Sequence, residues 1–286
     1  MIPVTLIIID GLRPDAIRQV RCPSLDWLRF NGSASFKARS VLPCYTLPCH
    51  TSIFYSTLPA QHGVLTNQWP LQVVPGRSLF DVIDAAGMKA AAFYNWESLR
   101  DLSRPGCLAL SYFRDNADHP AGDQVIADAA AQALIHEPPA FTFVYLGTLD
   151  NVGHARGWLS DEYLRQLERV DHAVGTVLSA CGSTGTVIVH SDHGGHDHEH
   201  GAALPEDMTI PWLAGGPGIR RKYLIERPLS LLDTAPTIAR LLHIPQPAEW
   251  QGRAVDEIFI GRGQQPHVVV PQPAFALMAD RYEGEY

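Results

Sequence analysis

The run VTLIIID, residues 4–10, consists of apolar or β-branched residues and ends in an aspartate. Similar runs follow later in the chain: KAAAFYN at 89–95, FTFVYLGTLD at 141–150 and GTVIVHSDH at 185–193. Continuous runs of this kind are typical of strands buried on both faces of a parallel sheet. The four runs therefore predict the central strands of one sheet.

The segments between these runs carry apolar residues at helical spacing. The clearest is 161–182, DEYLRQLERVDHAVGTVLSACG, which Ser160 precedes and Gly182 ends. A helix within 231–244 has Asp233 or Thr234 as its N-cap and Pro236 in its first turn. Further helices are expected at 22–32, 50–58, 78–87 and 121–135. Alternating strands and helices predict an α/β fold, with helices on both faces of a mostly parallel sheet.

Length and composition limit the organisation of the chain. Its 286 residues, 46% of them hydrophobic, suit one domain over 1–286 and exclude disorder. Residues 95–125 have the least regular pattern, and we expect a small lid there. The proline-rich stretches at 245–248 and 266–273 are expected to be surface connections.

Charge and cysteine content indicate the environment and exclude some partners. A net charge of −8 argues against binding to a nucleic-acid polymer. The sequence has no apolar run near the ~20 residues that span a bilayer, and its N-terminus lacks the pattern of a secretory signal. Five cysteines without CxxC pairing predict free thiols. We therefore expect a cytoplasmic protein without membrane insertion, and its oligomeric state stays open.

Carboxylates and imidazoles recur where predicted strands end, and ligands of open α/β sheets bind beyond those ends. Carboxylate oxygen with neutral imidazole suits zinc, manganese or iron. Taken alone, Asp10 could equally be a helix N-cap, and the pair Asp150–His154 could be a solvated turn. Together they predict a metal site at one edge of the sheet. The candidate ligands are Asp10, Asp150, His154, Asp192, His193 and His200.

Several separate blocks agree, in order, with one known superfamily. They are IIIDGLRPD (7–15), TLPCHTSIFYSTLPAQHGVLTN (46–67), LDNVGHARG (149–157), SDHGGHDHEHG (191–201) and PEDMTIPWLAGGPGI (205–219). The chain resembles the alkaline phosphatase superfamily, and within it the type I phosphodiesterase/nucleotide pyrophosphatase family. This resemblance implies a three-layer, alkaline-phosphatase-like fold with a site for two divalent metal ions.

The resemblance also implies a role for each matching residue. One metal ion would be bound by Asp150, His154 and His200, and the second by Asp10, Asp192, His193 and the nucleophile Thr46. Asn67 would donate a hydrogen bond to a phosphate oxygen. Zinc is the expected metal, although manganese or iron would suit the same ligands. His196 and His198 have no assigned role, and either could replace His200.

The surroundings of Thr46 permit two interpretations. With Pro48 in the first turn, Thr46 lies at or near a helix N-terminus, where threonine is usually a structural cap. The same position would let the helix dipole and a metal ion favour its alkoxide, which makes it a nucleophile. Attack on phosphorus would form a phosphothreonine that water then hydrolyses. The expected substrate is a small phosphate ester or nucleotide, cleaved at a phosphodiester or pyrophosphate bond.

Other functions stay open at the same site. The residues after Thr46 lack the C/S-x-P-x-R pattern of sulfatases, whereas phosphonoacetate-hydrolase-like or phosphomonoesterase activity would use the same residues. Arg13 could bind a dianionic monoester, but a pairing with Asp15 is the simpler expectation. A catalytically silent metal-binding relative is the non-enzymatic alternative. Aromatic residues that could stack on a nucleobase are Trp69, Tyr94, Trp96 and Trp158.

Overall fold

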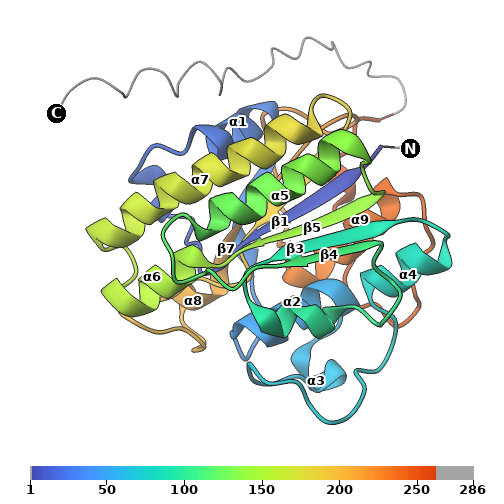
Figure 1. The fold of residues 1–286 in the computed structure, drawn as a ribbon, viewed down its shortest axis with the longest axis horizontal. Coiled ribbons are helices and arrows are strands. Elements are labelled where there is room, and N and C mark those ends of the chain that lie inside the picture. Colours follow the sequence, from blue (N-terminus) through green and yellow to red (C-terminus); the bar gives the residue numbers. More distant parts are fainter. Residues whose placement is uncertain (1, 262–286) are drawn as a thin grey trace.

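The computed structural model describes residues 2–261, in which eight strands form one sheet between two layers of helices (Figure 1). The strand order is β4-β3-β5-β1-β6-β7-β2-β8. Only β7 runs antiparallel to its neighbours within the described part of the chain, so the sheet is mostly parallel, as predicted. The strands are β1 (Val4–Ile9), β2 (Gly32–Arg39), β3 (Ala90–Tyr94), β4 (Leu110–Phe113), β5 (Phe141–Leu146), β6 (Thr186–His190), β7 (Thr209–Gly215) and β8 (Tyr223–Leu224).

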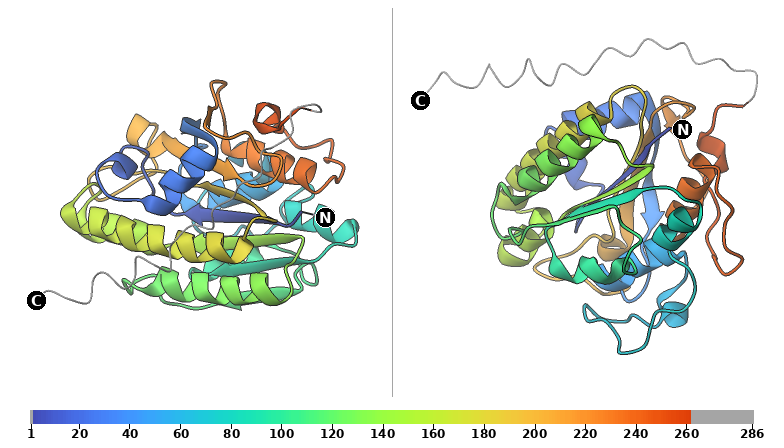
Figure 2. Two further views of the ribbon diagram at one scale, coloured as in Figure 1. Left: turned by 90° about the horizontal axis from the view of Figure 1, so that it is seen from above. Right: turned by 45° about the vertical axis from the view of Figure 1, so that its right-hand side comes forward.

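Helices cover both faces of this sheet (Figure 2). One layer contains α1 (Pro23–Asn31), α5 (Gly122–His136), α6 (Thr148–Arg156) and α7 (Asp161–Cys181). The other contains α2 (Thr46–Tyr55), α4 (Leu79–Ala85) and α9 (Thr234–Leu241), with the short α3 (Pro59–His62) beside α2. Shorter elements are α8 (Pro205–Met208) and the 3₁₀ helices η1 (Ala16–Arg18), η2 (Glu97–Leu102), η3 (Leu231–Asp233) and η4 (Asp256–Ile258). The predicted α/β fold is confirmed.

The central strand β1 explains the two layers. It pairs in parallel with β5 on one side and β6 on the other. Leu6 and Ile8 pack into the apolar cluster beneath α2 and α9, whereas Ile7 and Ile9 pack beneath α5 and α7. Side chains alternate between the faces of a strand, so a strand covered by helices on both sides must be apolar throughout.

The structure corrects two predicted boundaries. The helix expected at 50–58 spans Thr46–Tyr55. The run FTFVYLGTLD ends as a strand at Leu146, and its last three residues begin helix α6. Asp150 is therefore in the first turn of a helix and not at the end of a strand. The turn between the elements is held by Asn95, which accepts a hydrogen bond from Gly147 N at 3.1 Å, and by Asp123, which accepts one from Thr148 Oγ1 at 2.6 Å.

Residues 95–125 have more regular structure than their pattern indicates. They include η2, the edge strand β4 and the start of α5. A lid function for this segment and the single-domain organisation of the chain stay predictions. The expected surface connection at 266–273 lies outside the described residues.

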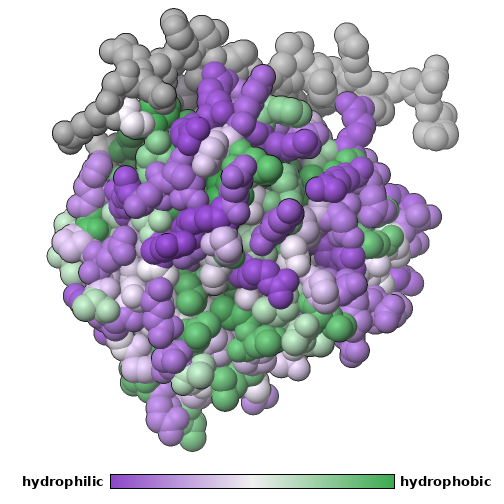
Figure 3. Space-filling model, turned by 180° about the vertical axis from the view of Figure 1, so that it is seen from behind, coloured by the Kyte–Doolittle hydropathy of each residue, from purple (hydrophilic) through white to green (hydrophobic). Residues whose placement is uncertain are grey.

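The molecular surface is mixed in character. Seen from behind, hydrophilic residues cover most of the upper and middle surface, while hydrophobic residues gather lower down (Figure 3). Across residues 2–261, none of the helices combines the length and apolarity needed to cross a membrane.

Candidate metal centre

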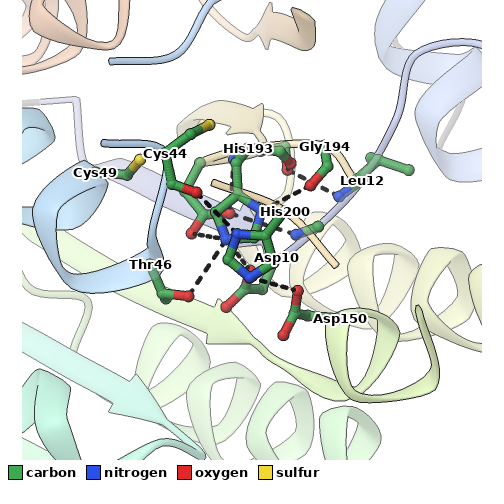
Figure 4. A network of polar contacts seen from close by, with 12 residues as sticks. Asp10, Leu12, Cys44, Thr46, Cys49, Asp150, His193, Gly194 and His200 are labelled. Carbon is green, nitrogen blue, oxygen red and sulfur yellow. Dashed lines mark hydrogen bonds and ion pairs between the residues drawn. The ribbon is translucent and has the colours of Figure 1, made fainter. Parts of the chain in front are cut away.

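Two groups of acidic and histidine side chains meet at the edge of the sheet where the parallel strands end (Figure 4). Asp10 directly follows β1, and Asp192 and His193 follow β6. Asp150 and His154 lie one turn apart on the same face of α6, which the chain enters just after β5. Thr46 is the first residue of α2. The fold thus brings together residues that are up to 190 positions apart (10 to 200) in the sequence.

The first group is built around His193, which is fully buried. Its Nε2 lies 3.1 Å from Asp10 Oδ1, 3.4 Å from Asp192 Oδ2 and 3.3 Å from Thr46 Oγ1. The Nδ1 of His193 donates to the carbonyl oxygen of Gly194 at 2.8 Å. The neutral ring therefore has its Nε2 lone pair directed at the two carboxylates, as in a metal-ligating histidine oriented by a backbone carbonyl.

The second group has Asp150 at its centre. Asp150 Oδ2 lies 3.4 Å from His154 Nε2, and its Oδ1 lies 3.8 Å from His200 Nε2. Backbone carbonyls again hold both imidazoles through Nδ1, because His198 O accepts from His154 and Cys44 O accepts from His200, each at 2.8 Å. The rings of His200 and His193 stack with centroids 3.7 Å apart. The two groups are therefore adjacent.

Unpaired carboxylate oxygens show that this donor set fits metal ions. Asp10 Oδ1, Asp150 Oδ1 and Asp192 Oδ2 are buried and have no hydrogen-bond partner among the described residues. A buried charged acceptor without a partner is costly, and cations between these oxygens and the three Nε2 atoms would satisfy them. Oxygen with imidazole nitrogen is a donor set that zinc, manganese and iron accept.

Burial disfavours the charged forms of these residues, and bound cations would reverse this effect for the carboxylates. Burial, and then the charge of Asp10, raises the pKa of Asp150 and the pKa of Asp192 well above the usual range. Burial lowers the pKa of His193 and lowers the pKa of His200 to about 2, which keeps both imidazoles in the neutral form that binds metal. A nearby cation favours ionised carboxylates, so metal binding would release protons.

The hydroxyl of Thr46 does not cap its own helix. Tyr45 occupies the N-cap position, and the described contact of Thr46 Oγ1 is the one with His193. The next backbone N–H, that of Leu47, donates to Asn67 Oδ1 at 2.9 Å. This contact assigns the Asn67 carbonyl to the helix and leaves its Nδ2 donors for another partner. The nucleophile and the phosphate-binding residue expected from the sequence therefore both lie at the N-terminus of α2.

Comparison with known proteins identifies the family. Residues 4–208 match the family described as type I phosphodiesterase / nucleotide pyrophosphatase. The chain belongs to this family. The resemblance found from the sequence motifs is thereby confirmed.

Relatives and solved structures agree with this membership. Ectonucleotide pyrophosphatase/phosphodiesterase family member 1 of Rattus norvegicus is 26% identical over 215 residues, which are 67% of this chain and 24% of the relative. The chain spans about a quarter of the length of the first curated relatives it matches. Murine ectonucleotide pyrophosphatase/phosphodiesterase 5, solved in an inactive form with AMP, superposes with a TM-score of 0.75 at 15% identity and covers 91% of this chain and 100% of its own. A phosphonate monoester hydrolase from Silicibacter pomeroyi gives 0.69 at 18%, with coverages of 93% and 78%. These likenesses show the fold.

Two further histidines of this family member lie outside both ligand groups. His196 Nδ1 is 2.8 Å from Asp207 Oδ1, which holds its ring away from Asp150. His198 is exposed, and it contributes its carbonyl oxygen to His154. The structure thus places His200 with the ligand group, as the sequence motif indicates.

The remaining candidates have other contacts. Arg13 forms a salt bridge with Asp15 at 2.6 Å, which is the pairing expected from the sequence. It also donates to the carbonyl oxygen of Gly195. Tyr94 and Trp158 are buried, so the structure contradicts their use as stacking surfaces. Trp69 and Trp96 are half-buried, and their stacking role stays untested.

Sequence reasoning missed Tyr145 altogether, and it named Trp158 only for stacking on a nucleobase, although both residues contact the ligand groups. Tyr145 Oη donates to Asp10 Oδ2. Trp158 packs edge-on against the imidazole of His154 with centroids 5.0 Å apart. Tyr145 lies inside an apolar strand and Trp158 inside a loop, so no motif distinguishes them from ordinary core residues.

Proposed function

We propose that this chain is a metal-dependent hydrolase that cleaves phosphodiester or nucleotide pyrophosphate bonds, with Thr46 as its nucleophile. The observation that carries the proposal is the position of Thr46 Oγ1, 3.3 Å from His193 Nε2 and beside the carboxylates of Asp10 and Asp192. A hydroxyl at a helix N-terminus and beside a metal-ligand group is suited to react as an alkoxide. Membership of the phosphodiesterase family supports the reaction class.

The proposed reaction has two displacements at phosphorus. Thr46 Oγ bonds to phosphorus and loses its proton to solvent, while the bond to the leaving group breaks and the departing oxygen takes up a proton from solvent. Water then displaces the threonine oxygen and restores the hydroxyl. The backbone N–H of Thr46 and the Nδ2 of Asn67 would bind the non-bridging oxygens, where negative charge increases in the transition state.

Two divalent cations are the proposed cofactors. Asp150, His154 and His200 would hold one, and the group around His193 would hold the other. Bound there, the pair would supply electrostatic stabilisation of the attacking and leaving oxygens. We propose zinc, with manganese or iron as metals that the same donors accept.

The substrate is proposed to be a small phosphodiester or nucleotide. The murine relative of the same fold is described in complex with AMP, which supports a nucleotide. Arg13 is engaged by Asp15 and Gly195 and is therefore withheld from a dianionic monoester. The phosphonate monoester hydrolase of similar fold favours a phosphonate ester as the second candidate.

All five cysteines are free thiols, which supports the cytoplasm as the compartment.

The test compares Thr46→Ala with a matched substitution in the same helix. Thr51 is also buried in α2, but its hydroxyl donates to the carbonyl of Leu47 and belongs to neither ligand group. We expect Thr46→Ala to lower kcat on bis-nitrophenyl phosphate by at least about 1,000-fold. Its metal content should remain near wild type, and Thr51→Ala should stay within about threefold of wild-type kcat.

Each alternative gives a different result in this assay. Preference for nitrophenyl phosphate over the diester would identify a monoesterase, and preference for a nitrophenyl phosphonate would identify a phosphonate hydrolase. Two bound metals without turnover of any ester would identify a silent relative. Full activity in Thr46→Ala would refute the nucleophile.

A further inference from the structure

His50 is a fully buried histidine of α2 that takes no part in the reaction described above. It lies one helical turn after Thr46, and its Nδ1 is 2.8 Å from the carbonyl oxygen of Thr46. The same nitrogen is 3.6 Å from Asp192 Oδ2. A carbonyl oxygen can only accept, so Nδ1 carries the proton and donates to the nucleophile's own backbone.

Packing alone does not account for a histidine at this position. The ring contacts Tyr145 and Phe143 edge-on, with centroids 5.2 and 6.0 Å apart, and a phenyl ring could make these contacts. His50 Nε2 is buried and has no hydrogen-bond partner among residues 2–261, an arrangement that destabilises a fold by about 1–3 kcal/mol. The Nδ1 bond is therefore the contact that a phenylalanine could not replace.

The same peptide unit is held at its other polar atom as well. The peptide between Thr46 and Leu47 presents the carbonyl that accepts from His50 and the N–H that donates to Asn67 Oδ1 at 2.9 Å. The atoms of a peptide unit are coplanar, so bonds to both its C=O and its N–H resist rotation of that plane. Rotation of this plane would move the Thr46 side chain.

We propose that His50 is a positioning residue for the nucleophile. Its Nδ1–H, acting with Asn67 Oδ1, clamps the Thr46–Leu47 peptide and thereby fixes the direction of Thr46 Oγ1. The inference rests on the proposed function, because it assigns His50 a role through Thr46. Misplacing a reacting atom by 1 Å costs on the order of 100-fold in rate, so a clamp on this peptide has a measurable effect.

The test replaces the donor while keeping the ring. His50→Phe retains the edge-on contacts and removes Nδ1–H, whereas His50→Asn returns an N–H donor at the corresponding position of the side chain. We expect His50→Phe to lower kcat about 10- to 100-fold with KM within threefold, full metal content and an undiminished Tm. His50→Asn should recover most of the lost kcat. Thr51→Ala, in the same helix, is the control.

Separate results distinguish failure of this inference from failure of the proposed function. A kcat of His50→Phe within twofold of wild type, or a loss that merely follows its folded fraction, overturns the clamp. If His50→Phe does not fold, His50→Met tests the same loss of the donor. Histidine ¹⁵N NMR of the wild type gives a reading independent of activity, because the Nε2–H tautomer of His50 would also overturn it. Unimpaired turnover by Thr46→Ala would refute the proposed function instead.

Discussion

Replacing Asp192 by asparagine should stabilise the metal-free protein, and in the metal-loaded protein this gain in stability should vanish or become a loss. Asp192 is fully buried; its Oδ1 accepts from Gly11 N at 3.4 Å and His193 N at 3.0 Å, and an asparagine oxygen can keep both bonds. Its Oδ2 has no hydrogen-bond partner in the described residues and lies 3.4 Å from His193 Nε2, which is an acceptor. An amide nitrogen there can donate to that acceptor and removes a charge that Asp10 repels.

The magnitude follows from the contacts that change. Satisfying the buried, unpaired oxygen should stabilise the metal-free protein by about 1–3 kcal/mol. This difference in stability between Asp192→Asn and the wild type, both free of metal, should increase with pH. Burial raises the pKa of Asp192 above its unfolded value, so the wild type loses stability as pH rises through the folded pKa and the asparagine variant does not. With metal present, a hundredfold weaker affinity removes about 2.7 kcal/mol of linked stabilisation. The net effect therefore reverses sign or vanishes.

The assay is urea unfolding at pH 8, with and without a chelator, beside metal affinity from chelator competition. Asp171→Asn is the matched control. Asp171 is also a buried carboxylate, but its oxygens accept from Ser24 N and Leu25 N, both at 2.9 Å, so its substitution should destabilise the protein in both conditions. Destabilisation of the metal-free protein by more than 1 kcal/mol would refute the reasoning from the unpaired oxygen, and an unchanged metal affinity would refute the assignment of Asp192 as a ligand.

Three further predictions concern residues around the centre. Burial raises the pKa of Asp123 to about 6. The free energy of unfolding of the wild type should therefore increase by about 1 kcal/mol, relative to Asp123→Asn, when the pH falls from 7 to 5. A difference between the two proteins in urea unfolding that does not change with pH would contradict this. Gly195→Ala would place a Cβ 2.2 Å from the ring of Trp158. The substitution should lower the free energy of unfolding by about 1–3 kcal/mol and should also lower the metal content. An unchanged Tm would refute the close contact. His198→Ala removes a 3.0 Å bond to the carbonyl of His154 but leaves the His198 carbonyl in place, so metal affinity should fall by about tenfold with unchanged stoichiometry. Loss of one whole metal ion would instead make His198 a ligand.

Local sequence patterns were sufficient to predict a strand or helix where its buried residues recur at regular spacing. The apolar run that forms β1 is buried on both faces, and α7 begins after its capping Ser160 and ends before Gly182, as the sequence predicts. The strands β2 and β7 were not predicted, because the apolar positions of GSASFKAR are mostly small alanines and TIPWLAG contains Pro211, which cannot donate to a strand ladder. Their pairing with each other forms these strands, and a local pattern does not contain that information.

The sequence by itself determined the central strands, the main helices, the family and the residue types available for a metal site. Only the tertiary structure decided which of these side chains face one another. Among the histidines of 190–200, two rings are oriented by partners outside this segment: His200 is held by the carbonyl of Cys44, and His196 is held by Asp207. The tautomer that directs each Nε2 at a carboxylate depends on the same bonds. Spacing along a loop does not specify such contacts, because they form only when the strands, α2 and α6 have assembled.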